Sequence, residues 1–241
     1  MKMEPHTMAP VEDKYTIVAT HPDDEFIGCR QFILANKDNI SNVIFMTNGE
    51  FSVYGYKEPS FAYQRRKESE GWLKHVLPRV NIYYMNMPDA VPLEHLDDYY
   101  GKDLFYQEHG LTRTAFLQKA ILSIAKDTIV VFNGFDNHPS HTATWYICYK
   151  AHEGTSKPII QYYVHKAFTK TEQEPGVAET KQPKSIQILY DYIYTEEEYA
   201  KKLKEFELYY VSQYEDFKKS NWMFGAGEYY LSETPINLEI K

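Results

Sequence analysis

The chain has 241 residues, of which 43% are hydrophobic and 25% are charged, and its formal net charge is −8. These fractions are typical of a globular protein that can bury a core without disulfides. The charge and the lack of a dense basic stripe argue against nucleic acid as a partner, and no apolar run is long enough to span a membrane. Cys29 and Cys148 make no disulfide framework, and the first twenty residues lack a signal-peptide core. We therefore expect a cytoplasmic protein without a membrane anchor, with residues 1–13 as a flexible leader.

Short β-branched runs alternate with amphipathic stretches along most of the chain. The pattern predicts strands at 15–20, 42–47, 81–85, 127–132, 158–168 and 185–190. It predicts helices at 25–37, 60–77, 112–126, 138–152 and 195–214, the last opened by a capping box of Thr195 and Glu198. The segments 50–59, 90–110 and 169–184 are predicted loops, and the tail from residue 221 is predicted to be irregular. Strands that alternate with helices predict an α/β fold with a mostly parallel sheet covered on both faces.

Two clusters of imidazole and carboxylate groups each follow a predicted strand. His21-Pro22-Asp23-Asp24-Glu25 comes directly after the first strand, and His138-Pro139-Ser140-His141 follows the strand at 127–132. In open α/β sheets, ligands bind in the crevice beyond the carboxyl ends of the strands. Each cluster alone is also explained by helix capping and by the helix dipole. Two such clusters at two strand ends of one sheet indicate the two halves of a metal site.

The residue types fit a hydrolytic metal site. Such a site commonly uses three protein ligands and keeps the fourth position for a water molecule, whose pKa the metal lowers to roughly 7. His21, Asp24 and His141 can supply the three ligands, which leaves Asp23 as the carboxylate that takes the proton of the water. His138 lies one turn before His141, so one imidazole can bind the metal while the other faces the substrate. Zn²⁺ is the first expectation, and Fe²⁺, Co²⁺ or Mn²⁺ also suit two imidazoles and one carboxylate.

These motifs resemble those of the PIG-L/LmbE family of zinc-dependent de-N-acetylases, which remove acetyl groups from N-acetylglucosaminyl compounds. The resemblance rests on the segments 20–25 and 138–141 and on the order of elements from about residue 14 to residue 168. Further family-like marks are Thr47-Asn48-Gly49-Glu50, Arg65-x-x-Glu68 and Pro88-Asp89. The resemblance implies a Rossmann-like three-layer sandwich, formed here by a single domain over residues 14–241.

The same resemblance implies roles for individual residues. It implies that His21, Asp24 and His141 bind zinc and that Asp23 is the general base. His138 would be a cationic group that stabilises the oxyanion or protonates the leaving amine. The remaining implied roles are contacts of Arg65 and Asp89 with sugar hydroxyls or with the aglycone.

Several positions depart from the family pattern or have a simpler explanation. Ser140 stands where the family usually has Asp, and Asp136 stands where some members carry Tyr or Arg, so contacts around the ligands and the oxyanion should differ. Arg65 and Glu68 are equally explained by a surface ion pair on a helix. Asp89 could be a turn residue, but its place just beyond the carboxyl end of a strand favours the site. The resemblance fades beyond residue 170, so we expect residues 169–241 to determine substrate specificity.

We therefore expect a metal-dependent hydrolase that removes an acetyl group from the amine of a small N-acetyl amino sugar, giving acetate and a free amine. One alternative is a metal-dependent amidase or esterase that acts on a non-sugar substrate. Another is a non-catalytic ligand-binding homologue, although such a protein would have lost ligands or the base. No Gly-x-Gly-x-x-Gly follows the first strand, which argues against dinucleotide binding. The pattern leaves open which acetylated compound is used and whether the chain forms a homo-oligomer.

Overall fold

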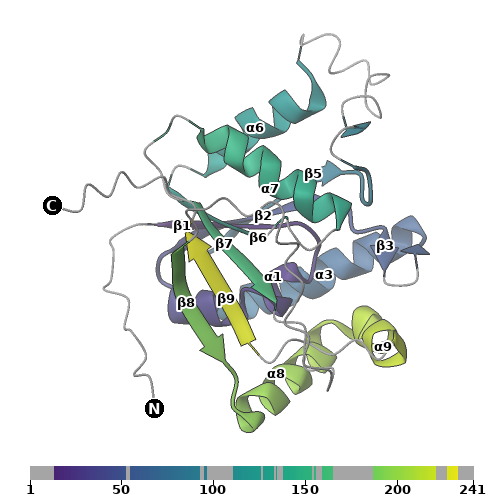
Figure 1. Ribbon diagram of the computed structural model, residues 1–241. Coiled ribbons are helices and arrows are strands. Elements are labelled where there is room, and N and C mark those ends of the chain that lie inside the picture. The colour runs from purple at the N-terminus through teal and green to yellow at the C-terminus, as the bar shows by residue number, and fades with distance from the viewer. Residues whose placement is uncertain are drawn as a thin grey trace, which may run out of the picture.

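In the computed structural model, the described residues form a central seven-stranded sheet (Figure 1). Its strand order is β5-β2-β1-β6-β7-β9-β8. The structure describes residues 14–52, 55–92, 95–96, 111–125, 127–132, 134, 138–153, 155, 159–164, 187–220 and 227–232. The strands are β1 (Tyr15–Ala19), β2 (Ile40–Thr47), β5 (Asn81–Met87), β6 (Thr128–Phe132), β7 (Ile159–Val164), β8 (Gln187–Ile193) and β9 (Gly227–Ser232). The strands from β5 to β7 pair in parallel, and β9 pairs antiparallel with both β7 and β8.

Helices cover both faces of this sheet (Figure 1). One face carries α1 (Asp24–Ile27), α2 (Arg30–Ala35), α3 (Pro59–Val76), α8 (Glu196–Tyr209) and α9 (Val211–Ser220), and the other carries α6 (Arg113–Ile124) and α7 (Pro139–His152). Alternate residues of β1 serve the two cores: Ile17 belongs to the first and Val18 to the second. A strand buried on both sides needs a nearly continuous apolar run, which β1 has apart from Thr16. The predicted α/β sandwich with a mostly parallel sheet is thereby confirmed.

The order of the strands reverses at β1. The chain runs from β1 outward to β2 and β5, and then returns to β6 on the other side of β1. Val18 of β1 therefore pairs with Ile44 of β2 on one side and with Val131 of β6 on the other. Such a reversal opens a crevice at the carboxyl ends of the two central strands, which are β1 and β6 here.

Two predicted helices are each divided in the structure. The helix expected at 25–37 is interrupted at Gly28 and Cys29, which separate α1 from α2. The helix expected at 195–214 ends at Tyr209 and continues as α9, because Tyr210 has a non-helical backbone with φ −114° and ψ 50°. The predicted capping box is present, with the amide of Glu198 donating to Oγ1 of Thr195.

The prediction of an irregular tail from residue 221 was wrong for Gly227–Ser232. This segment is β9, which fills the space between β7 and β8, and its pairing partners lie far away in the sequence. The predicted loop 50–59 contains a small two-stranded sheet of β3 (Phe51–Ser52) and β4 (Gly55–Tyr56). The predicted leader 1–13 and the predicted loop 169–184 lie outside the described residues. None of the described helices combines the length and apolar character that a membrane crossing requires.

Candidate metal centre

The loop that follows β1 is tied to the end of β2. Both the amide and Oγ1 of Thr47 donate to the carbonyl of Thr20, each at 2.9 Å. Gly49 has a φ of +76°, and a Cβ there would lie 3.0 Å from Cδ of Pro22. A residue with a side chain would therefore be strained and would push against the loop. The segment after β2 is thus shaped to fit the loop that carries the first cluster.

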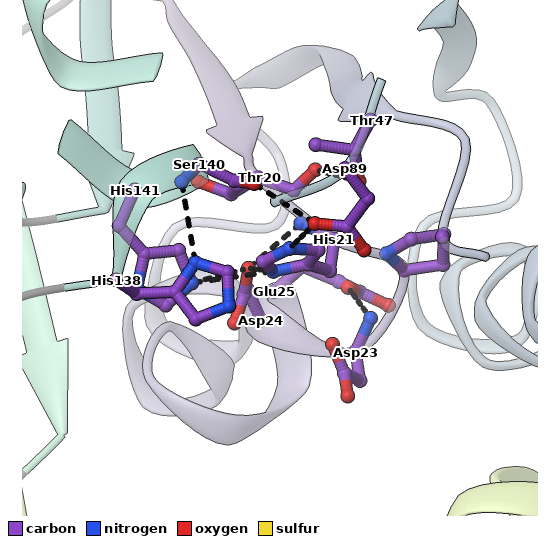
Figure 2. Close-up of polar contacts among 12 residues, drawn as sticks. Thr20, His21, Asp23, Asp24, Glu25, Thr47, Asp89, His138, Ser140 and His141 are labelled. Atoms are coloured by element: carbon purple, nitrogen blue, oxygen red, sulfur yellow. Dashed lines mark hydrogen bonds and ion pairs between the residues drawn. The ribbon is translucent and has the colours of Figure 1, made fainter. Parts of the chain in front are cut away.

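His21, Asp24 and His141 bring three polar atoms together at the carboxyl ends of β1 and β6 (Figure 2). Nδ1 of His21 lies 3.1 Å from Oδ2 of Asp24 and 3.2 Å from Nε2 of His141, and the third side, from Asp24 to His141, is 3.5 Å. All three residues are buried. Ligand atoms around a tetrahedral zinc ion with bonds of about 2.0–2.1 Å lie about 3.3 Å apart. The spacing of this triangle therefore fits a metal ion.

His138 is a rival for the position of third ligand. The ligand atoms of His21, His138 and His141 all lie within 4.8 Å of one another. Nδ1 of His138, however, accepts a hydrogen bond from the amide of Ser140 at 3.3 Å and so caps α7. The shorter distances within the triangle, and the charge of a carboxylate facing a cation, favour Asp24.

The second ring nitrogen of His21 is held by Asp89, which follows β5. Nε2 of His21 lies 2.8 Å from Oδ1 of Asp89, and this oxygen also accepts from Oγ of Ser140 and from the amide of Ala90, both at 2.8 Å. A carboxylate on the far nitrogen fixes the imidazole ring and leaves Nδ1 directed at the metal position. The structure thus brings Asp89 to the site, as a buried partner of His21.

Charges around the triangle favour a cation. Burial alone would lower the pKa of His21, but the carboxylates of Asp89 and Asp24 outweigh it and raise that pKa to about 10. Burial would raise the pKa of Asp24, but His141 and His21 hold it well below its usual range. In the metal-free protein, a proton on His21 therefore offsets the negative charge of Asp24 and Asp89. A bound divalent cation would take over this role.

Asp23 lies beside the triangle and pairs with Arg65. Oδ1 of Asp23 is 3.0 Å from the guanidinium of Arg65, and both side chains are buried. Burial raises the pKa of Asp23 to about 6, with Arg65 opposing the rise and Asp24 adding to it. A carboxylate with this pKa is ionised at neutral pH and close to the range in which a general base is most effective.

Arg65 and Glu68 do not form the surface pair that was the simpler explanation for their spacing. Arg65 is only 4% exposed and donates to the carbonyls of Gly49 and Phe51 as well as to Asp23. Glu68 accepts from the amide and the hydroxyl of Ser212, at the start of α9. Arg65 therefore points away from solvent and connects α3 to the loop that carries Asp23.

The surroundings of His138 bear on the charge expected for its side chain. Burial lowers its pKa, and the neighbouring imidazoles of His21 and His141 lower it further, to about 4. In the metal-free protein these surroundings favour the neutral imidazole, whereas the resemblance implies a cationic one. Ser140, which departs from the family pattern, donates to Asp89, and Asp136 lies outside the described residues.

The contacts behind the first cluster had no signal in the sequence. Glu25 is fully buried, and its Oε2 accepts from the amide of Asp23 while its Oε1 accepts from the hydroxyl of Tyr210. Nε2 of Gln213 donates to the carbonyl of Pro22. These partners are 185 and 191 positions apart in the chain, so no local pattern relates them.

Comparisons with known proteins identify the family of this chain and proteins that share its fold. The model of the family described as "PIG-L: GlcNAc-PI de-N-acetylase" matches residues 16–152, which is more than half of the chain. No curated protein is similar in sequence to this chain. Among solved structures, the zinc-inhibited form of teicoplanin deacetylase matches with a TM-score of 0.55 and 14% identity, over 93% of this chain and 100% of that one.

Two further solved structures share the fold at low identity. N,N'-diacetylchitobiose deacetylase from Pyrococcus horikoshii has a TM-score of 0.53 and 18% identity, over 93% of this chain and 88% of that one. A conserved protein from Thermus thermophilus has a TM-score of 0.52 and 16% identity, over 93% of this chain and 96% of that one. At these identities the likeness concerns the fold.

Proposed function

Because this chain belongs to the PIG-L family of GlcNAc-PI de-N-acetylases, we propose that it is a metal-dependent hydrolase that removes the acetyl group from a small N-acetyl amino sugar. The observation that carries the proposal is the triangle of His21, Asp24 and His141 with the carboxylate of Asp23 beside it. The deacetylases of teicoplanin and of N,N'-diacetylchitobiose, which share the fold, support the reaction type. Acetate and a free amine would be the products.

His21, Asp24 and His141 would hold the metal, with Zn²⁺ as the first candidate and Fe²⁺, Co²⁺ or Mn²⁺ as alternatives. When bound, such an ion polarises the amide carbonyl and acidifies water. Asp89 would keep His21 oriented for this task through its 2.8 Å contact with Nε2.

Asp23 would act as the general base and then as the general acid. Its carboxylate takes a proton from the attacking water and returns a proton to the amine as the C–N bond breaks. Arg65 keeps this carboxylate in one orientation through the 3.0 Å ion pair. The pKa of about 6 leaves Asp23 ionised at neutral pH, ready to accept the proton.

His138 would stabilise the oxyanion as a neutral donor. Because Nδ1 accepts from the amide of Ser140, the ring proton of the neutral imidazole lies on Nε2. An N–H group aimed at the developing negative charge typically contributes about 3–4 kcal/mol to the transition state. His138 would thus be a catalytic residue that acts in its neutral form.

Asp89 remains our candidate for a substrate contact. Its Oδ2 is buried and has no hydrogen-bond partner within the described part of the protein. A sugar hydroxyl that reached this oxygen would satisfy it, because a buried acceptor without a partner costs free energy. The predicted contact of Arg65 with the substrate stays a prediction, in addition to the ion pair that Arg65 makes with Asp23.

The test is acetate release by metal-loaded protein from a panel of N-acetylated amino sugars and non-sugar acetamides, beside the Asp23→Asn variant. We expect release from a sugar, a loss of about 10²–10⁴-fold in Asp23→Asn, and full metal content in both proteins. Release from non-sugar amides alone would instead support the amidase alternative. No release from any compound, with metal bound, would overturn the proposal in favour of a binding protein.

A further inference from the structure

The peptide group between Pro22 and Asp23 is held at both of its polar ends. Its oxygen accepts from Nε2 of Gln213 at 3.0 Å, and its N–H donates to Oε2 of Glu25 at 2.9 Å. The other oxygen of Glu25 accepts from the hydroxyl of Tyr210 at 2.6 Å. Glu25 and Tyr210 are fully buried and Gln213 is 4% exposed, so water competes little with these hydrogen bonds.

Tyr210 and Gln213 act from one turn of the chain. The amide of Gln213 donates to the carbonyl of Tyr210 at 3.0 Å, at the junction of α8 and α9. The ring of Tyr210 is stacked on Phe206, with centroids 4.8 Å apart, and packs against Phe26 at 5.1 Å. This packing fixes the direction of the Tyr210 hydroxyl, so the junction is a firm support for the peptide group.

The backbone of Asp23 needs such a support. Asp23 has φ 151° and ψ −28°, a conformation that residues with side chains rarely adopt. A strained conformation persists only where the surrounding structure holds it. The direction of the Asp23 carboxylate depends on this backbone, so a relaxed peptide group would turn the proposed base away from its position.

We infer that Tyr210 and Gln213 are positioning residues for the proposed base: the junction of α8 and α9 clamps the 22–23 peptide group and thereby directs Asp23. The inference rests on the proposed function. Both residues lie outside the segment 16–152 that matches the family model, so the C-terminal helices contribute to the catalytic loop itself.

The test uses Tyr210→Phe and Gln213→Met, which remove the polar contacts and keep most of the packing volume. We expect kcat to fall by about 10- to 100-fold in each, because small misplacements of catalytic groups have effects of this size. KM and metal content should stay within about twofold of the wild-type values, since binding is left intact. The matched control is Ser212→Ala, which removes a hydrogen bond between α9 and Glu68 of α3 and should keep wild-type kcat.

A second readout needs no substrate. Hydrogen exchange at the amide of Asp23 should be at least about tenfold faster in Tyr210→Phe and Gln213→Met, and unchanged in Ser212→Ala. Glu25→Gln should preserve the arrangement, because an amide can still accept from Asp23 and donate to the oxygen of Tyr210. Near wild-type kcat in Glu25→Gln would show that Glu25 positions the amide of Asp23 and that catalysis needs no proton from Glu25.

The outcomes separate this inference from the proposed function. Wild-type protein that releases no acetate refutes the proposed function, while the exchange measurement still decides whether the clamp exists. Unchanged exchange in both variants overturns the clamp, and faster exchange with unchanged kcat overturns its role in catalysis. If Tyr210→Phe fails to fold, Gln213→Met carries the same test, because the side chain of Gln213 donates directly to the carbonyl of Pro22.

Discussion

In the candidate metal centre, the loop after β1 is held by side chains from several other parts of the fold, whereas the start of α7 is held by its own first turn and by the contact of Ser140 with Asp89. The loop receives Arg65 from α3, Asp89 from the segment after β5, and Tyr210 and Gln213 from the junction of α8 and α9. Its central residue, Asp23, has a strained backbone. The position of this half therefore depends on contacts that are remote in sequence.

The start of α7 depends on local chemistry. Nδ1 of His138 accepts from the amide of Ser140, the carbonyl of His138 accepts from the amide of Thr142, and Pro139 begins the helix. The ring of His141 packs against Phe132 of β6, with centroids 4.1 Å apart. A ligand on a capped helix needs few remote supports, whereas a base on a strained loop needs many. Substitutions at a distance should therefore affect the first half more than the second.

The largest effect should follow from removing a ligand on either side of this comparison. Asp24→Ala in the loop and His141→Ala in α7 should each weaken metal binding by more than about 100-fold, because each removes one corner of a three-ligand site. Metal content after dialysis, determined by elemental analysis, is the measurement. His75→Ala, on the exposed face of α3, is the control. Stoichiometric metal in either ligand variant would show that this half is not part of the centre.

Asp89→Asn should have the next largest effect, chiefly through its contact with His21 in the loop half. Loss of the charge beside Nε2 of His21 should weaken metal binding by about 10- to 100-fold without unfolding the protein. Titration of the metal against a competing chelator measures this change. Asp127 lies just before β6, at the end of the strand that is opposite to the metal centre, so Asp127→Asn should bind metal as the wild type does. Equal affinities in the two variants would contradict the orienting role of Asp89.

Acid should weaken metal binding, again through His21. The pKa of His21 is raised to about 10 in the metal-free protein, so at pH 7 the ring carries a proton that the metal must displace. Affinity should therefore fall about tenfold for each pH unit of acidification below that value. Calorimetry in two buffers of different ionisation enthalpy should detect about one released proton per metal at pH 7. Binding at pH 7 without proton release would contradict this account.

The smallest effect should come from Ser140→Ala, which removes the link between the two halves. Oδ1 of Asp89 would keep its contacts with His21 and with the amide of Ala90, so the free energy of unfolding should fall by only about 1 kcal/mol. Denaturant unfolding of the metal-free protein provides the value. Ser123→Ala, exposed on α6, should change it by less than about 0.5 kcal/mol. A loss of several kcal/mol would mean that Ser140 holds the two halves together.

The sequence by itself determined the features that depend on neighbouring residues. Buried parallel strands show as β-branched apolar runs, so β1 and β6 and the clusters at their carboxyl ends could be predicted. The capping box at Thr195 is equally local, since it joins residues three positions apart. These signals were enough to predict that His21, Asp24 and His141 lie at one site.

Only the tertiary structure decided how the site is held and charged. Several features depend on segments that lie far apart in the sequence and share no local pattern. They are the pairing of β9, the break between helices at Tyr210, the contact of Asp89 with His21, and the clamp on the 22–23 peptide group. The lowered pKa of His138 likewise depends on burial and on two imidazoles, one of which, His21, lies 117 positions earlier in the chain. Hydrogen bonds and charges act through space, so such contacts are fixed by the packing of the whole chain rather than by the order of its residues.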